Sequence, residues 1–261
     1  MSGALLSNLQ SIVALVLLGL SLLCIPRAFV RARQIWWGDD SPAGFGRLLG
    51  GAVGIAAVVR WLIAPRWIVT MFIGYLLTEQ AIELSTVSHY GIASQALYHA
   101  LFSILPRDHR YLLWTNSVLG VLTLPLLASV AARLFANRRV GIAFALVVAL
   151  TPLFIKNDNS DANNVPCLLW LFGGLLLWEE FLDTGAREAL LCAAALLSLA
   201  GVSRPEMPIL VPLFVLALTV CLWPRRARLA DPVLWIAIVL AGLLCIPHAI
   251  HVAHSPLLNV A

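Results

Sequence analysis

The stretch that decides the fold is LLSNLQSIVALVLLGLSLLCI, Leu5 to Ile25, which contains no acidic or basic residue. A run of this length and apolarity can cross the hydrocarbon core of a bilayer as one helix. It has no basic segment before it and no small-residue cleavage site after it, so we expect a retained span and not a removed signal peptide. The first element of the chain is therefore predicted to be a transmembrane helix.

The whole chain has the same apolar character. Hydrophobic residues make up 61% of its 261 residues and charged residues only 11%, and its mean hydropathy is +0.92. This composition excludes a soluble globular domain. Because bilayer hydrocarbon offers backbone groups no water, spans are helices or closed barrels, and the long Leu, Ala and Val runs lack the alternation of a barrel. We predict an all-α integral membrane protein, a polytopic helical bundle of about eight spans.

Further apolar runs follow the first span. They cover Leu48–Ala64, Leu113–Phe135, Val140–Ile155, Val165–Leu182, Ala189–Val202, Met207–Trp223 and Val233–Ile250. Several are shorter than the roughly 20 residues that cross a typical bilayer, so local thinning or polar residues reaching outward make up the difference. We expect residues 1–47 to form an additional N-terminal span with a cytoplasmic turn, and residues 48–261 to form the main membrane domain.

The distribution of basic residues predicts which loops lie on each side of the membrane. If the segment Trp67–Ser85 does not cross the membrane, most arginines gather on one side, which the positive-inside rule favours. These are Arg27, Arg31, Arg33, Arg47, Arg133, Arg138, Arg139, Arg187, Arg225, Arg226 and Arg228, against Arg66, Arg107, Arg110, Lys156 and Arg204 on the other side and Arg60 within a span. Residues 65–112 then form a long outer loop with interfacial helices, and the inner arginine-rich turns suit anionic lipid headgroups.

The predicted outer loop carries acidic and aromatic side chains. In LLTEQAIELS, Glu79 and Glu83 are four residues apart and therefore share one face of a helix on the membrane surface. A carboxylate shielded from water can act as a general base, and the same spacing also fits the solvated face of an interfacial helix. His89 and Tyr98 lie among apolar residues at helical spacing. This pattern fits a lipid-interface belt or a substrate groove, and we interpret it as the belt.

Two further outer segments carry charge near the span ends. The turn SRPE places Arg204 beside Glu206. A phosphate is the natural bidentate partner of an arginine in such a place, and the alternative is an arginine that reaches the headgroups or pairs with Glu206. Lys156 has the same two interpretations. It opens the polar stretch KNDNSDANN, which contains Asp161 and is either one wall of a wet cavity between helices or an exposed turn.

The succession of these features resembles a known family. The segment HYGIASQALYHALFSILPRDHR, the hairpin turned by RLFANRR, the span end LTPLFI before a polar loop with an Asp, and the Arg-Pro-Glu turn are similar to polytopic GT-C glycosyltransferases. The likeness is to bacterial relatives of protein O-mannosyltransferases and aminoarabinose transferases, and it covers roughly Leu48 to the C-terminus. Such relatives usually continue with more spans or an outer domain, so the resemblance implies a chain shortened relative to them.

This resemblance implies sugar transfer on the outer face of a bacterial inner membrane, by a multi-pass protein of the cell envelope. The donor would be a polyprenyl-phosphate sugar, and the acceptor a hydroxyl group on a lipid, glycan or protein. Glu79 would be the base, with Glu83 second, while Arg204 and Lys156 would stabilise charge on the departing phosphate. Asp161 would sit at the rim and orient the sugar or the acceptor.

The sequence points to few other partners. We expect no required cofactor, with a divalent metal ion left open, and membrane lipids as partners but no nucleic acid, since no basic aromatic groove is found. Two other classes of function stay open. A transporter or flippase-like protein would carry ionisable residues mid-span and paired broken helices, whereas Arg60 is the one basic residue that charge sorting leaves within a span. A non-catalytic assembly subunit would fit the short chain.

Overall fold

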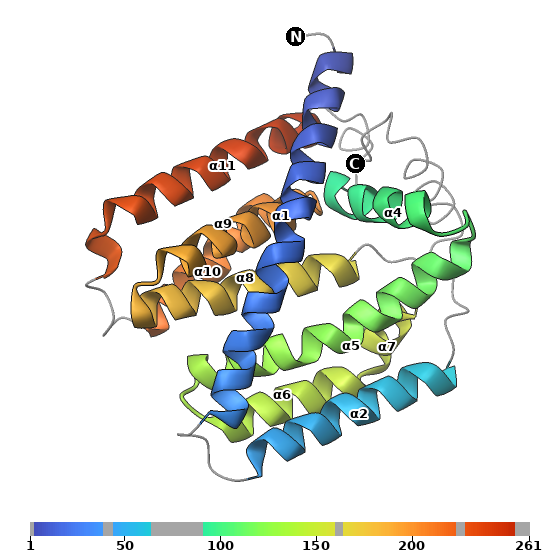
Figure 1. Ribbon diagram of the computed structural model, residues 1–261, viewed down its shortest axis with the longest axis vertical. Coiled ribbons are helices and arrows are strands. Elements are labelled where there is room, and N and C mark those ends of the chain that lie inside the picture. Colours follow the sequence, from blue (N-terminus) through green and yellow to red (C-terminus); the bar gives the residue numbers. More distant parts are fainter. Residues whose placement is uncertain (1–2, 39–43, 64–90, 160–163, 223–227, 254–261) are drawn as a thin grey trace.

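The protein is a bundle of α-helices, seen here in a computed structural model that describes residues 3–38, 44–63, 91–159, 164–222 and 228–253. Within these ranges no strand occurs (Figure 1). The helices are α1 Gly3–Trp37, α2 Phe45–Ile63, α4 Ile92–Ile104, α5 His109–Leu134, α6 Arg138–Leu150, α7 Pro152–Asp158, α8 Asn164–Thr184, α9 Arg187–Gly201, α10 Met207–Cys221 and α11 Pro232–Ala253. The prediction of an all-α protein is confirmed for this part of the chain.

Five helices are long and apolar enough to cross a membrane, namely α1, α2, α5, α8 and α11. The pair α6 and α7 would add a sixth span, although the two helices are bent by 67°. The helices α9 and α10 have 15 residues each, fewer than the roughly 20 that a typical bilayer needs. The protein is therefore a polytopic helical membrane protein, and the figure of about eight spans stays a prediction.

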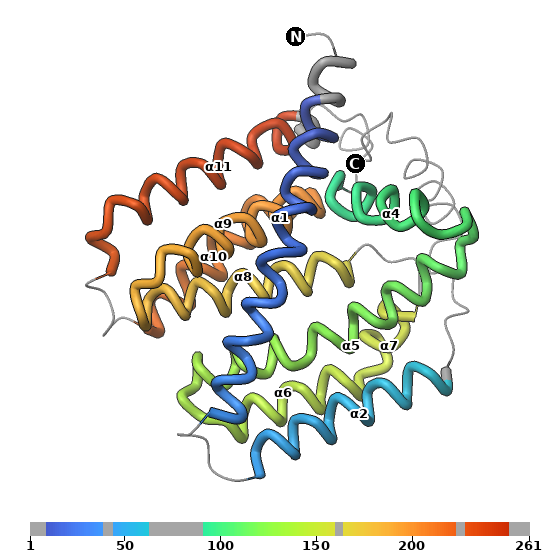
Figure 2. The backbone as a smooth tube through the Cα atoms, in the orientation of Figure 1, coloured from blue at the N-terminus to red at the C-terminus, as the bar shows by residue number. Residues whose placement is uncertain are grey.

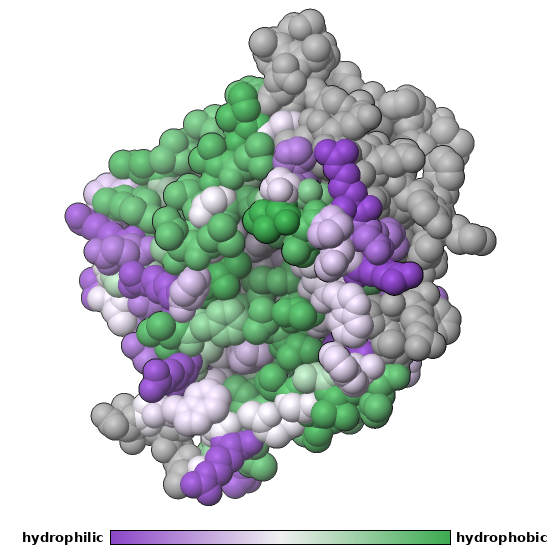
Figure 3. All heavy atoms as spheres, turned by 45° about the vertical axis from the view of Figure 1, so that its right-hand side comes forward, coloured by the Kyte–Doolittle hydropathy of each residue, from purple (hydrophilic) through white to green (hydrophobic). Residues whose placement is uncertain are grey.

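The surface agrees with a membrane setting. Figure 3 shows a broad apolar zone with hydrophilic residues gathered toward two opposite sides of it. Many large apolar side chains of the protein are well exposed, among them Leu23 at 75%, Leu62 at 75% and Ile209 at 69%. So many exposed apolar side chains would be costly in water and suit a lipid surround.

A break between α6 and α7 corrects the predicted span Val140–Ile155. The helix ends at Leu150, and Thr151 has an extended backbone with φ −69° and ψ 121°. Pro152 follows, which has no N–H to continue the hydrogen-bond ladder and which disfavours helical geometry in the residue before it. The chain therefore turns and restarts as α7, a bend that Figure 2 traces. Hydropathy alone does not reveal this bend.

The helices alternate in direction, which gives the bundle two ends (Figure 1). At one end, here called the basic end, α1, α5, α8 and α10 finish and α2, α6, α9 and α11 begin. At the other, here called the Arg204 end, α2, α7 and α9 finish and α5, α8 and α10 begin. The described arginines that charge sorting assigns to the inner side lie toward the basic end, and Lys156 and Arg204 lie at the Arg204 end.

The long helix α1 is fixed by ion pairs near the basic end. It continues past the predicted limit at Ile25 as far as Trp37. Arg31 contacts Glu179 at 3.0 Å and Asp183 at 2.7 Å, both on α8. Arg133 from α5 joins the same two carboxylates, so three helices meet at one cluster. The predicted additional span thus packs on the main membrane domain, and the boundary after residue 47 stays a prediction.

Glu179 is the central carboxylate of this cluster and is only 1% exposed. We expect Glu179→Gln to lower the free energy of unfolding by about 2 kcal/mol, because the partly buried guanidinium groups of Arg31 and Arg133 lose one of the two carboxylates that they share. Its neighbour Glu180 is the matched control, since it contacts only Arg27 at 2.9 Å, near the surface. Thermal unfolding in detergent should show a much smaller loss for Glu180→Gln. Equal losses would contradict the assigned role of Glu179.

Candidate functional site

The turn between α9 and α10 holds the predicted phosphate-binding arginine. Arg204 is half-buried, and its Nε lies 2.5 Å from Oε1 of Glu206. This is an ion pair by distance, but the N–H is not directed at the carboxylate and no other described group accepts its hydrogen bond. The alternative interpretation, that Arg204 pairs with Glu206, therefore agrees with the distance between the two side chains. A guanidinium can also bind a phosphate in bidentate geometry.

The start of α4 docks on this turn. The Ile92 N–H donates a hydrogen bond of 3.1 Å to the carbonyl of Val202. Gly91 has a φ of 113°, and a Cβ atom there would lie 2.0 Å from the carbonyl oxygen of Ser203. Only glycine allows both the backbone angle and the close approach. Gly91, the first described residue of this segment, therefore lies directly against Ser203 and Arg204.

The first turns of α8 form another side of the same region. The Cys167 thiol donates to the carbonyl of Ala200 over 3.8 Å and lies close enough to interact with Ser203 and with the charge of Arg204. One turn earlier, Oδ1 of Asn164 is buried and accepts no hydrogen bond from any described residue. Buried amide oxygens normally have a donor. Asn164 is thus a candidate ligand contact that the sequence interpretation missed.

A buried ion pair fixes the end of α7. Arg60 from α2 donates through Nε to Oδ2 of Asp158 at 2.8 Å, and its Nη2 contacts the same oxygen. Both side chains are almost fully buried. Asn159 accepts from the Ser117 hydroxyl at 2.8 Å and donates to the Arg60 carbonyl at 3.4 Å. The last described residue before the gap at 160–163 is thereby held to α2 and α5.

Close helix packing makes this arrangement possible. A Cβ atom on Gly120 of α5 would lie 2.4 Å from the carboxyl carbon of Asp158. Sequence inspection noted Arg60 as the one basic residue within a span, which by default needs a partner. The partner Asp158 is 98 positions away, and no local pattern identifies it.

The other predicted site residues are placed as follows. Lys156 is exposed on α7 and, two positions from the buried Asp158, points to roughly the opposite face of that helix. Glu79, Glu83, His89 and Asp161 lie outside the described residues. The structure therefore brings together α4, the Arg204 turn and the start of α8, and it does not bring Lys156 into contact with Arg204.

The aromatic belt interpretation is wrong for Tyr98. This residue on α4 has no exposed surface, and its hydroxyl donates to Oδ1 of the buried Asn116 at 2.8 Å. A belt residue would place its ring at the lipid interface. Instead α4 is held inward against α1 and α5, with Gln95 and Ser94 also fully buried. The sequence signal for this inward packing is Asn116, a polar residue inside an apolar run.

The candidate site contains no metal-binding cluster among its described residues, and the cavity at the basic end lies elsewhere. Within the described ranges, no group of three His, Cys, Asp or Glu side chains is placed to hold a metal ion. A cavity of about 570 Å³ lies at the basic end, beside Arg133 and Arg138. Because it is at the far side of the bundle from the Arg204 turn, it is not part of the candidate site.

The fold and the site describe a polytopic membrane protein with polar groups converging at one end of its helices. Comparison with known families matches residues 93–251, from α4 to α11, to the family described as Dolichyl-phosphate-mannose-protein mannosyltransferase. More than half of the chain is matched, so the chain belongs to this family of GT-C membrane glycosyltransferases, as the sequence resemblance predicted. No curated protein and no solved structure matches the chain.

The predicted site residues fall both inside and outside the family match. Lys156, Asp161, Arg204 and Glu206 fall within the family match, which begins at residue 93. Glu79, Glu83 and His89 precede it, as does Arg60 on α2. The match is therefore shorter than the predicted resemblance from Leu48 onward. Arg60 nevertheless reaches into the matched part through Asp158.

Proposed function

We propose that the protein transfers a sugar from a polyprenyl-phosphate donor to a hydroxyl group of a lipid, glycan or protein acceptor at the Arg204 end. The observation that carries this proposal is the hydrogen bond from Ile92 to Val202, which holds the exit of the acid-bearing loop against Arg204. Glu83 precedes Gly91 by eight residues, a length of chain that spans at most about 28 Å. A chain of this length allows the Glu83 carboxylate to reach the guanidinium, as the proposed reaction requires.

The proposed reaction is a substitution at the anomeric carbon. The carboxylate of Glu79 takes the proton of the acceptor hydroxyl, with Glu83 as second candidate, and the oxygen forms the new glycosidic bond. The bond between the anomeric carbon and the phosphate oxygen breaks, and the lipid phosphate leaves with the electron pair. Arg204 exchanges Glu206 for this phosphate when the donor binds, and it stabilises the charge that develops as the bond breaks. Catalysis of this kind depends on groups placed before the reaction begins.

Other polar residues are proposed to position the substrates. His89 stands two residues before Gly91 and is assigned to the phosphate or the sugar. The buried Oδ1 of Asn164 is assigned to a hydroxyl group of the sugar, because an amide oxygen accepts hydrogen bonds. Asp161 orients the sugar or the acceptor, directly after the segment that Arg60 and Asp158 anchor. Lys156, exposed on α7, binds the headgroup region of the donor. The Arg204 end faces outward from a bacterial inner membrane in this proposal, as the positive-inside rule predicts.

Transfer of radiolabelled sugar from polyprenyl-phosphate donors, by purified protein in nanodiscs, tests the proposal. We expect Glu79→Gln to lose about 100-fold to 10,000-fold in rate, as for removal of a general base, and Arg204→Ala about 100-fold or more. Arg110→Ala is the matched control, because Arg110 is 84% exposed at the same end of the bundle and should keep full activity. Folding of each variant is checked by thermal unfolding.

A folded wild type that is inert with every donor, while a family member is active in the same assay, would overturn the enzyme proposal. One observation favours a transporter, namely the bent pair α6 and α7 beside a buried ion pair. However, Arg60 and Asp158 neutralise each other, and transporters use a second broken helix at the corresponding position, which the described ranges do not contain. Movement of the lipid-linked sugar across liposomes without any acceptor would establish that alternative.

A further inference from the structure

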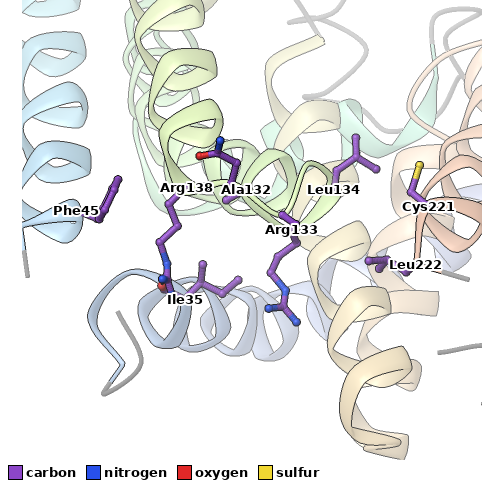
Figure 4. Close-up of a pocket in the computed structure, with 10 residues that line it drawn as sticks. Ile35, Phe45, Ala132, Arg133, Leu134, Arg138, Cys221 and Leu222 are labelled. Atoms are coloured by element: carbon purple, nitrogen blue, oxygen red, sulfur yellow. The ribbon is translucent and has the colours of Figure 1, made fainter. Parts of the chain in front are cut away.

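The cavity at the basic end has a mixed lining that the proposed transfer reaction does not use. It encloses about 570 Å³ between the ends of α1, α5 and α10 and the starts of α2 and α6, a volume in the range of small-molecule sites. Arg138 supplies its positive charge, while Ile35, Phe45, Leu134 and Leu222 supply apolar surface. Arg133 also lines the cavity, but its guanidinium pairs with Glu179 and Asp183 on α8. Figure 4 shows the Arg138 side chain extending toward Ile35 of α1.

The polar part of the lining is organised for an anion. Arg138 donates through Nε to the carbonyl of Ile35 at 3.1 Å, so its guanidinium is held against the cavity wall. The N-terminus of α6, with its partial positive charge, begins at the same place. Asn137 caps it by accepting from the Arg139 N–H at 2.9 Å. The Arg138 guanidinium and the N-terminus of α6 therefore meet at one cavity.

The apolar part continues onto a lipid-facing surface. Immediately beyond the cavity, the ring of Phe135 is 54% exposed and stacks on Phe144 of α6 with 6.1 Å between ring centroids. Because the spanning helices end here, the cavity lies at the level of the lipid headgroups and the exposed rings lie where acyl chains begin. A ligand that fits both surfaces is anionic at one end and apolar at the other.

We propose that this cavity is a binding site for an anionic phospholipid of the leaflet at the basic end. Its phosphate binds beside Arg138, and its acyl chains cover the α5–α6 hairpin. A soluble phosphate compound would use Arg138 but would leave the apolar half of the lining and the stacked rings unused. Basic pockets between membrane helices are known to hold lipid headgroups in this way. The proposal does not depend on the transfer reaction.

Adjacent arginines provide a sharp test. Arg138 lines the cavity, whereas Arg139 is exposed next to it and does not. Detergent-purified protein is titrated with phosphatidylglycerol, and the melting temperature and the lipid retained in native mass spectra are measured. We expect saturable binding to wild type and to Arg139→Gln, and at least a tenfold weaker affinity for Arg138→Gln, since glutamine keeps a donor for Ile35 but loses the charge. Phosphatidylcholine should bind far more weakly.

Three outcomes would overturn the proposal. Equal losses in Arg138→Gln and Arg139→Gln would indicate general attraction to a basic surface. A full response to glycerol phosphate, without acyl chains, would indicate a free-anion site. If Arg138→Gln fails to fold, Cys221→Trp replaces it, because the larger ring fills the cavity from its α10 side and leaves both arginines in place. Unchanged phosphatidylglycerol binding by a folded Cys221→Trp variant would likewise contradict the site.

Discussion

Asp158→Ala is expected to leave much of the protein unfolded. The change removes the only described carboxylate that contacts Arg60, whose side chain is 2% exposed. An uncompensated buried charge of this kind costs about 3 to 5 kcal/mol, a large share of the roughly 5 to 15 kcal/mol that holds a typical protein folded. Size-exclusion profiles and thermal unfolding in detergent should show a low yield of monodisperse protein and a lower melting temperature.

A double variant separates charge from packing in this prediction. Arg60→Met combined with Asp158→Ala removes both charges, and the flexible methionine fills most of the space of the arginine. We expect the double variant to be more stable than Asp158→Ala alone, because no buried charge is then left without a partner. If the two variants were equally destabilised, loss of contacts at α7 would be the cause and the ion pair would not.

Gly91→Ala is expected to lower sugar transfer at least 100-fold. Alanine disfavours a φ of 113°, and its Cβ would collide with the Ser203 carbonyl, so the start of α4 must move away from the Arg204 turn. Displacement of catalytic groups by about 1 Å can cost about 100-fold in rate. The strain in the backbone adds about 1 to 3 kcal/mol of instability. The nanodisc transfer assay and thermal unfolding measure the two effects separately.

Gly54→Ala is the matched control for this substitution. Gly54 lies within α2, and a Cβ atom there would meet no other atom within 4 Å. Alanine at such a helix position is neutral or stabilising by up to about 1 kcal/mol, so transfer should be unchanged. Full transfer by a folded Gly91→Ala variant would show that contact between α4 and the Arg204 turn is not needed for the reaction.

Much of the fold could be predicted from the sequence because a bilayer imposes simple requirements on it. Apolar length predicted helices at every place where the structure describes a long one, and the sorting of arginines agreed with the two ends of the bundle. Hydropathy does not indicate where the backbone bends at a single residue or where a helix ends. The bend at Thr151 and the continuation of α1 beyond Ile25 both depended on such local geometry or on distant partners.

The candidate site was predictable in part for a similar reason. The Arg204 turn stood out because an arginine near the membrane requires a partner, and Arg60 stood out within its span. Asp158 belongs to a polar stretch in which any of several residues could have been chosen, and Tyr98 looked like a belt residue until its bond to Asn116 was known. Contacts between residues far apart in the chain decided each of these cases.

The cluster around Glu179 has a consequence for the order of biosynthesis. Arg31 is made 148 residues before its partner Glu179. At a synthesis rate of about 5 to 20 residues per second, this interval is on the order of 10 s. During that time the first helix holds its position in the membrane without its counter-charges, so its arginines must rest among lipid headgroups. The emergence of α8 then locks α1 in place, which makes α8 the step at which the nascent bundle becomes committed to its final arrangement.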